Sequence, residues 1–455
     1  MWILSKLATI KRFWNIIQSS VKKNHLRISL FSLFVFLACL SLYRHKNVVS
    51  NTFRSEIWSD RAGYYVYLPS TFLYNFSASD FPDSTESLTG NGFKLMNGKV
   101  VTKYTYGIAL LESPFFGIAH FLSYLSNKPK DGFSFFYQKL IDIAAAFYLA
   151  IALYLLFLSL KAYTRLNSRP IFISLFLVFF GTNLYYYSIV ETGMSHVYSF
   201  FLFSGLLYIL THKNKFKHEL QTNTIQSIVI WLIILIRPIN LIFIIIPLTW
   251  DTQNLKEVLI RIQNKLKPKI LLVWLTSFFL IFTPQFIYWK YAFGSYLTYS
   301  YVNESFSNLL NPNITEVLLS PFNGLLPYSL IFPVILVGVF LMIKNKSSLG
   351  FYCLFVLCSL IYITASWHDW KFGCGAGMRN MVEYYSLLSF PLCIFINRIS
   401  SLKTKLLKIS LSFFFCTLLF ISFKVNYHFY GCYFGGTWDW NCYYNTLVYP
   451  LNHHN

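Results

Sequence analysis

Charged residues are scarce in this chain, and acidic residues are the scarcest of all. Only 12% of the 455 residues are charged, and Asp and Glu together number 17. A soluble protein of this length carries roughly twice that charged fraction, so the composition excludes an ordinary soluble domain. Instead 55% of the residues are hydrophobic, and several apolar runs are long enough to cross a bilayer. We expect an all-α integral membrane protein with a single membrane domain, 1–455.

The net charge of +21 invites a nucleic-acid-binding interpretation, but the positions of the charges argue against it. Lys and Arg gather in short segments between apolar runs, as in 161–169, 213–217, 256–269 and 398–408. Such segments are typical of cytoplasmic loops that face anionic lipid. We therefore expect the lipid bilayer as a partner and no nucleic acid.

The eight cysteines carry little information. Most lie in apolar runs, where cysteine behaves as a small core residue. Cys374, Cys432 and Cys442 fall in segments that we place outside the membrane. A Cys432–Cys442 bridge is an option that the sequence leaves open.

The apolar runs predict a bundle of about eleven membrane segments. A basic cytoplasmic leader, 1–27, precedes the first run, Ile28–Tyr43, which we expect to be a retained anchor and not a cleaved signal peptide. The other clear spans are Lys139–Leu160, Pro170–Ile189, Val197–Leu210, Ile270–Tyr288, Pro327–Ile343, Leu349–Ser366, Met381–Ile396 and Leu407–Phe423.

The run Tyr106–Leu125 is apolar, but a span here would place the basic segments 161–169 and 213–217 outside, against the positive-inside rule. Glu112 and Pro114 in its middle also make it a poor lipid-facing helix. We expect a helix that lies on the outer surface or re-enters it. A large first outer loop, 44–137, would then carry juxtamembrane helices.

The run Ile225–Trp250 is interrupted by Arg237–Asn240 and has basic segments on both sides. A hairpin of two half-helices keeps both flanks cytoplasmic, and it would place Arg237 inside protein at the tip. A single span is the alternative. With the hairpin, the C-terminal tail 424–455 lies outside.

Many of the few acids fall in the segments placed outside, and those segments are rich in aromatic residues. Carboxylates among aromatic rings suit a saccharide, because sugar faces stack on rings while their hydroxyls take directed hydrogen bonds. The simpler explanation is the aromatic belt that membrane proteins have at their interfaces.

The stretch "WSDRAGYYVYLPS" at 58–70 places Asp60 just after the first span. Transfer of a sugar from a phosphate-linked donor needs a carboxylate that takes a proton from the nucleophile, and cations that hold the departing phosphate. Candidate cations are Arg61, Lys103, Arg237 and Arg379. The alternative role for Asp60 is a helix cap at the membrane surface.

Taken together, these blocks resemble the multispanning glycosyltransferases of the GT-C fold, which include protein O-mannosyltransferases and aminoarabinose transferases. The resemblance is carried by Asp60 with "GYYVYLP", "KYTYGIALLESPFF" from Lys103, "GTNLYYYSIVETGMSH" from Gly181, "IRPIN" from Ile236, and "SWHDWKFGCGAGMRN" from Ser366. It implies a polyprenyl-phosphate-linked sugar as donor and a lipid, glycan or protein acceptor at the outer face.

The resemblance also implies residue roles. Asp60 would be the catalytic carboxylate, and Lys103 and Arg379 would contact the donor phosphate, with Arg237 as a further cation. The expected substrate cavity comprises Arg61, Tyr64, Tyr65, Glu191, His196, Glu304, His368 and Asp369. Family branches that carry paired acids differ from this chain, where Arg61 follows Asp60. One carboxylate beside a cation is a poor site for Mg²⁺ or Mn²⁺, so we expect no metal and no cofactor.

Two other functions remain to be weighed. A transporter or flippase of lipid-linked saccharides would place ionisable residues at the midplane of several helices, whereas the apolar runs here are nearly free of charge apart from Arg237 and Glu383. A non-catalytic scaffold would tolerate Asp60→Asn. The glycosyltransferase hypothesis explains the acids best, and it places the protein in a bacterial inner membrane with its active site facing the periplasm or exterior.

Overall fold

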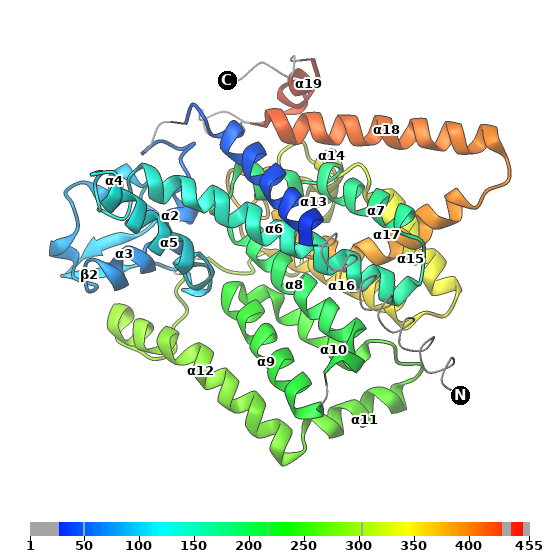
Figure 1. The fold of residues 1–455 in the computed structure, drawn as a ribbon, viewed down its shortest axis with the longest axis horizontal. Coiled ribbons are helices and arrows are strands. Elements are labelled where there is room, and N and C mark those ends of the chain that lie inside the picture. The colour runs from blue at the N-terminus through cyan, green and yellow to red at the C-terminus, as the bar shows by residue number, and fades with distance from the viewer. Residues whose placement is uncertain (1–26, 49–50, 217, 302–303, 430–437, 449–455) are drawn as a thin grey trace, which may run out of the picture.

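The computed structural model describes residues 27–48, 51–216, 218–301, 304–429 and 438–448. In this part of the chain, seven helices are long and apolar enough to cross a membrane: Arg27–Arg44, α5 (Gly107–Leu125), α6 (Phe135–Thr164), α9 (Glu219–Ile236), α12 (Pro268–Phe293), α16 (Ser348–Ser366) and α18 (Lys405–His428). Shorter apolar helices are α7 (Ser168–Phe180), α8 (Ser195–Thr211), α15 (Phe332–Lys344) and α17 (Tyr385–Ser400). The predicted all-α multi-pass membrane protein is confirmed (Figure 1).

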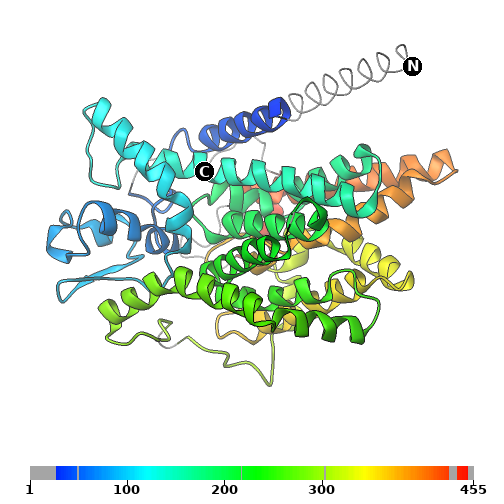
Figure 2. The same ribbon diagram turned by 60° about the horizontal axis from the view of Figure 1, so that its bottom comes forward.

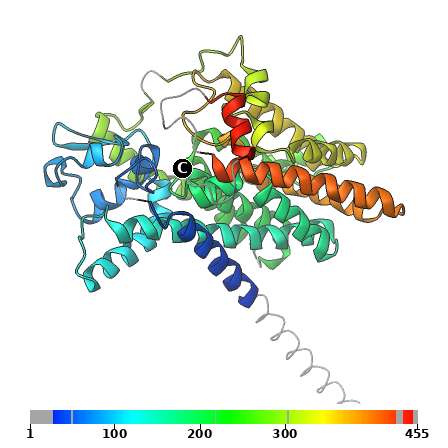
Figure 3. The ribbon, with the colours of Figure 1, turned by 90° about the horizontal axis from the view of Figure 1, so that it is seen from above.

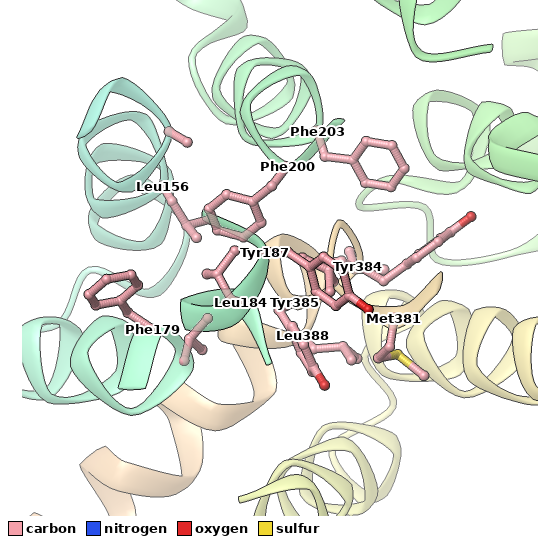
Figure 4. Packing of buried hydrophobic residues seen from close by; sticks show 14 of the residues in the cluster. Leu156, Phe179, Leu184, Tyr187, Phe200, Phe203, Met381, Tyr384, Tyr385 and Leu388 are labelled. Atoms are coloured by element: carbon pink, nitrogen blue, oxygen red, sulfur yellow. The ribbon is translucent and has the colours of Figure 1, made fainter. Parts of the chain in front are cut away.

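The helices α6 and α8 lie at the centre of the bundle and pack along each other. Small residues on α6, among them Ala145, Ala146 and Ala152, are fully buried and let the two backbones approach closely. Beside this pair, aromatic side chains pack together: the ring centroids of Phe203 and Tyr384 lie 5.1 Å apart (Figure 4). Most residues of these two helices are therefore buried.

Two predicted spans end differently in the structure. The run Pro170–Ile189 is helical only to Phe180, after which residues 186–190 form a π-helical turn, η2 (Tyr186–Val190). Asn183 explains part of this break, because its amide donates to the carbonyl of Ala376 at 2.8 Å and side-chain bonds of this kind compete with the helix. The tail predicted from 424 also begins later, since α18 continues to His428.

Other boundaries shift by a few residues. The predicted span from Met381 starts with a short 3₁₀ turn, η5 (Arg379–Met381), and α17 follows. The predicted span from Pro327 divides into α14 (Leu325–Tyr328) and α15. Further short elements are η1 (Ala78–Asp80), α4 (Thr85–Leu88), η3 (Lys213–Lys215), α13 (Ile314–Leu319) and α19 (Trp440–Val448).

The chain reverses at Arg237, as the hairpin hypothesis requires. Helix α9 stops there, and η4 (Pro238–Ile245) and α10 (Ile246–Thr249) run back. The amphipathic helix α11 (Leu255–Lys265) contacts both ends of the hairpin: Lys265 donates to Asn223 and Gln226 at 2.5 and 2.9 Å, and Arg261 donates to the carbonyl of Trp250. Both flanks therefore lie on the same side of the bundle.

Residues 51–134 gather at one end of the molecule, opposite the far ends of α15 and α18 (Figures 2 and 3). They form α2 (Asp60–Tyr65), α3 (Tyr67–Phe72) and a hairpin of β1 (Lys94–Met96) with β2 (Lys99–Val101), in which Leu95 pairs with Val100. The turn is Asn97–Gly98, both with positive φ, as a two-residue hairpin turn needs. Lys103 and Tyr104 follow directly after the second strand.

Helix α5 follows, and its contacts place it beside only the first half of α6. The carbonyl of Leu111 accepts a hydrogen bond from Tyr148, and His120 meets Tyr137, so α5 runs antiparallel to the start of α6. By length and composition alone α5 is long enough to span. Its pairing with half of α6 favours the surface or re-entrant arrangement, which stays a prediction.

Candidate active site

Asp60 is the first residue of α2 and projects from the end of the bundle that residues 51–134 build. Ser59 precedes it with a positive φ of 50°, and no side chain caps the helix. The Asp60 carboxylate instead points to two distant partners. The helix-cap explanation for Asp60 is therefore wrong.

Tyr104 is the first partner. Its hydroxyl donates to Oδ1 of Asp60 at 2.5 Å, and its ring lies 4.2 Å from that of Tyr64. This approach depends on Gly63, where a Cβ atom would lie 2.5 Å from the Tyr104 ring. The glycine in "DRAGYY" thus lets a phenol reach the carboxylate three residues before it.

Arg379 is the second partner. Its two terminal nitrogens both lie 3.4 Å from Oδ2 of Asp60. The guanidinium is carried by η5, and the preceding segment is held by Asn323, whose amide donates to the carbonyls of Lys371 and Gly373. Side-chain exposures of 32% for Asp60 and 16% for Arg379 leave the pair accessible from one side.

These neighbours determine the ionisation of Asp60. Burial alone would raise the pKa of the Asp60 carboxyl, but the positive charge of Arg379, the hydrogen bond from Tyr104 and the charge of Lys103 together hold that pKa below its usual range. Asp60 is therefore a carboxylate at neutral pH. It is ready to accept a proton but is held as a weak base while Arg379 contacts it.

Lys103 borders the same site. Its ammonium pairs with Glu304 at 2.6 Å, and its carbonyl accepts from Ser300. The Lys103 and Glu304 side chains are 37% and 26% exposed, so the pair is open to solvent. Two expected site residues are thus brought together beside Asp60.

Arg237, at the hairpin tip, lies in a buried polar network. It donates to Glu383 at 2.8 Å and to the amide oxygen of Asn380, while His196 lies 3.1 Å from the other oxygen of Glu383. Asn380 directly follows Arg379, so the network supports the segment that presents the site arginine. The pairing of Arg237 with Glu383, one of the alternatives for this arginine, is present.

The remaining candidates separate into two groups. Tyr64 lies in the site against Tyr104, whereas Tyr65 turns away and donates to the carbonyl of Gly132. Arg61 also turns away, toward the carbonyl of Phe53.

Glu191 and His196 do not bind each other. Glu191 accepts from Tyr186 at 3.2 Å, while His196 binds Glu383. Asp369 caps its own turn by accepting from the backbone of Gly373, and His368 is exposed on the same loop. Asp369 and His368 are not brought to Asp60 in the described structure.

Sequence reasoning missed Tyr104 and Asn380, although both lie next to candidates that it named. It also missed a buried cluster behind the site, in which Lys139 contacts Glu56 at 2.7 Å and Asp142 at 3.6 Å, and His45 contacts Asp142 at 2.9 Å. The sequence did contain a signal for this cluster: Lys139 and Asp142 lie one turn apart near the start of a long apolar helix. Unpaired charges are costly there, so partners for both could have been expected.

The donor atoms around Asp60 do not suit a divalent metal. Its close partners are a guanidinium and a phenol, and Glu304 is paired with Lys103. In the described residues one group of potential ligands is close enough together, His45, Glu56 and Asp142, and there Lys139 already contacts both carboxylates. Metal independence of the proposed reaction stays a prediction.

An apolar cavity of about 590 Å³ lies beside the site, between α3, α5 and α12. Its lining includes Tyr67, Leu110, Ile287 and Tyr288. Tyr67 connects the cavity to the site, because its hydroxyl donates to the carbonyl of Tyr104 at 2.7 Å.

The disulfide that the sequence left open is not formed, because Cys442 is not disulfide-bonded. A bridge exists instead at Cys374, in the loop that leads to Arg379. The other cysteine of the proposed pair, Cys432, lies outside the described residues.

No protein-family model matches the chain, and no curated protein matches it. Three solved structures of an oligosaccharyltransferase from Archaeoglobus fulgidus match its fold. The structure of AglB in complex with an inhibitory peptide and a dolichol-phosphate has a TM-score of 0.46 at 13% identity. The structure tethered with an acceptor peptide has 0.44 at 12%, and the apo form has 0.47 at 13%.

Each match covers 87% of this chain and 54–55% of the oligosaccharyltransferase, so this chain spans about half the length of the proteins it matches. Those proteins are GT-C-fold membrane enzymes, the class that the sequence resembles. At these scores and identities the likeness concerns the fold alone and says nothing about the activity or substrates of this chain.

Proposed function

We propose that this protein is a membrane glycosyltransferase that moves a sugar from a polyprenyl-phosphate-linked donor to an acceptor, with Asp60 as the catalytic base. The observation that carries the proposal is the ionised Asp60 carboxylate in contact with Arg379 and close to Lys103. It combines a proton acceptor with cations for a phosphate, at one end of a helical membrane bundle.

In the proposed reaction, Asp60 accepts the proton of an acceptor hydroxyl or amine as that atom forms a bond to the anomeric carbon. The bond between the anomeric carbon and the phosphate oxygen breaks, and its electron pair leaves with the lipid phosphate. Arg379 and Lys103 would hold that developing negative charge. The proton then resides on Asp60 and the lipid phosphate departs as an anion.

Arg379 would couple donor binding to the strength of the base. While it contacts Asp60, it lowers the pKa of that carboxyl. A donor phosphate would compete for the guanidinium, since arginine binds phosphate oxygens well. Weakening of the Asp60–Arg379 contact would then raise the pKa of Asp60 and make it a better base once the donor is in place.

The apolar cavity between α3, α5 and α12 supports a lipid-linked donor. Its tyrosine, phenylalanine, leucine and isoleucine side chains suit a hydrocarbon chain. Tyr67, which lines the cavity, donates to the carbonyl of Tyr104, and the hydroxyl of Tyr104 binds Asp60. A polyprenyl tail in this cavity would present its phosphate near Lys103 and Arg379.

Arg237 takes a different role in this proposal from the one that the sequence suggested. Its nitrogens are engaged by Glu383 and Asn380, and its side chain is 12% exposed. We therefore assign it as a positioning residue for the Arg379 segment and not as a direct phosphate ligand. His196 would help to hold Glu383 in that network.

The proposal places the site at the periplasmic or outer face of a bacterial inner membrane, because the basic segments then lie in the cytoplasm. It also leaves a lipid, glycan or protein as acceptor.

The test uses membranes that contain the wild-type chain and membranes that lack it. Radiolabelled polyprenyl-phosphate sugars and nucleotide sugars are supplied in parallel, and label in lipid, glycan and protein fractions is counted. The proposal expects chain-dependent transfer from the polyprenyl donors only. Chain-dependent movement of the labelled donor across vesicles without transfer would support the flippase alternative and contradict the proposal.

A further inference from the structure

A second polar pocket, formed by entirely different side chains, lies next to the Asp60 site. It is a cavity of about 130 Å³ between the end of helix Arg27–Arg44, the segment 53–61 and the turn after η2. Asp60 faces Tyr104 and Arg379, whereas its neighbour Arg61 faces this second cavity. The backbone of these two residues therefore separates two charged sites.

Four cations line this cavity: Arg44, Lys46, Arg54 and Arg61. Among the described residues, Glu191 is the acid that lines it with them. In a chain with 38 Lys and Arg, basic residues are common, but many of them gather in the short segments between apolar runs. Here four of them line one hollow together with the Glu191 carboxylate, so positive charges outnumber negative ones among its described lining residues, which favours an anion.

The cations are held in place by the surrounding structure. Arg44 donates to the carbonyl of Tyr427 at 2.8 Å and lies 4.8 Å from its ring centre. Lys46 lies 4.2 Å from the ring centre of Tyr43, and Arg54 lies 5.3 Å from that of Phe53. Such cation–π contacts orient a charge without neutralising it.

Arg61 forms the base of the pocket. It is only 5% exposed, and it donates to the carbonyls of Phe53 and Trp58. Gly193 packs directly against its side chain. Burial and the like charge of Arg44 lower the pKa of Arg54.

We propose that this pocket binds the phosphate group of a membrane lipid, at a site separate from the donor phosphate at Arg379. Guanidinium groups match the geometry of phosphate oxygens, and a single water molecule needs only about 10–15 Å³, so the cavity has room for a phosphate group. Arg44 ends a helix that is long and apolar enough to cross a membrane. The pocket therefore lies where lipid headgroups are concentrated.

The proposal goes beyond the transfer reaction and does not depend on it, because binding is measured without a donor sugar. The full chain is purified in a neutral detergent and titrated with dihexanoyl phosphatidate and with inorganic phosphate in a calorimeter. We expect saturable binding of phosphatidate, with inorganic phosphate as a weaker competitor.

The decisive variant is Lys46→Gln combined with Arg54→Gln, because both side chains are exposed. Its matched control is Lys94→Gln with Lys130→Gln, two exposed cations at the same end of the molecule that do not line the cavity. We expect at least about a tenfold loss of phosphatidate affinity in the first variant, since a charge-assisted hydrogen bond is worth that much. The control should bind like wild type.

Each other outcome overturns the proposal. If the wild-type chain shows no saturable binding of phosphatidate, the pocket is not a lipid phosphate site. If both double variants lose phosphatidate affinity equally, the binding is general electrostatic attraction and not a property of this pocket. Binding of inorganic phosphate without phosphatidate would overturn the lipid as the source of the phosphate. Because the Asp60 site is untouched in both variants, failure here would leave the proposed transferase activity intact.

Discussion

Both terminal nitrogens of Arg379 lie 3.4 Å from Oδ2 of Asp60, although 319 positions separate the two residues in the chain. The contact joins the segment after the first described helix to the segment before α17. Oδ1 is left to Tyr104. Because arginine also binds phosphate oxygens well, a donor phosphate would compete with Asp60 for this guanidinium. One arginine therefore connects the proposed base with the proposed leaving group.

Replacing Tyr104 with Phe removes the hydrogen bond to Asp60 and keeps the ring against Tyr64. That hydrogen bond lowers the pKa of Asp60, so its loss raises the pKa. The acid limb of kcat/KM for sugar transfer should therefore move to higher pH. Tyr74→Phe is the control, and an unmoved acid limb in Tyr104→Phe would contradict the account.

Replacing Arg379 with Gln removes a cation from both the base and the donor phosphate. We expect KM for the polyprenyl-phosphate donor to rise and kcat to fall, with a combined loss on the order of 10²-fold, as when one charge-stabilising donor is removed. Arg379→Lys should retain part of the activity because it keeps the charge. Steady-state kinetics with varied donor would check this. An Arg379→Gln enzyme with unchanged donor KM would remove Arg379 from phosphate binding.

Replacing Glu383 with Gln should destabilise the fold. Glu383 is fully buried and pairs with Arg237 and His196, so the change leaves a buried arginine without its countercharge. Breaking such a pair costs about 3–5 kcal/mol, which would appear as a lower Tm in detergent. The paired variant Arg237→Leu with Glu383→Leu should recover much of the loss. If Glu383→Gln unfolds at the wild-type temperature, the network contributes nothing to stability.

Stability should decrease as pH rises across the range near neutrality. Burial, and next the charge of Asp142, raise the pKa of Glu56 to about 7. The pKa of His45 is also raised: burial lowers it, but the charge of Asp142, the hydrogen bond to Asp142 and the charge of Glu56 together outweigh burial. Groups whose pKa is higher in the folded state bind more protons there, so their stabilisation is lost as pH rises through that pKa.

The measurement is Tm in detergent from about pH 5 to about pH 8, for wild type and Glu56→Gln. Glu56→Gln should flatten the decline, because one of the two titrating groups is gone. A Tm that increases over this range in wild type would show that the cluster titrates in the opposite sense.

The membrane organisation follows from local features of the sequence. The basic segments on both sides of the run 225–250 predicted the chain reversal at 237–240, because a hairpin keeps both flanks on the cytoplasmic side. The Asn97–Gly98 turn, by contrast, was not used, although that dipeptide is a strong hairpin signal. Helix ends were less predictable where side chains such as Asn183 bond to distant backbone.

The site could be predicted only in part, because its partners come from distant segments. Charge and position in the sequence predicted Asp60, Lys103 and Arg379 as site residues. They did not predict which acid each cation contacts. Glu191 and His196, one turn apart in sequence, bind Tyr186 and Glu383 instead. Tyr64 and Tyr65 look equivalent in the sequence, yet adjacent helical residues point about 100° apart, so one faces the site and the other does not.

The most direct test of the central claim compares Asp60→Asn with wild type and with Asp83→Asn, an exposed acid in the same segment. All three chains are brought to equal levels in membranes, and transfer of radiolabelled sugar from polyprenyl-phosphate donors is counted. The account predicts that Asp60→Asn loses about 10²- to 10⁴-fold in rate, the contribution of a general base, while Asp83→Asn transfers like wild type. Wild-type rates in Asp60→Asn would contradict the assignment of Asp60 as the base.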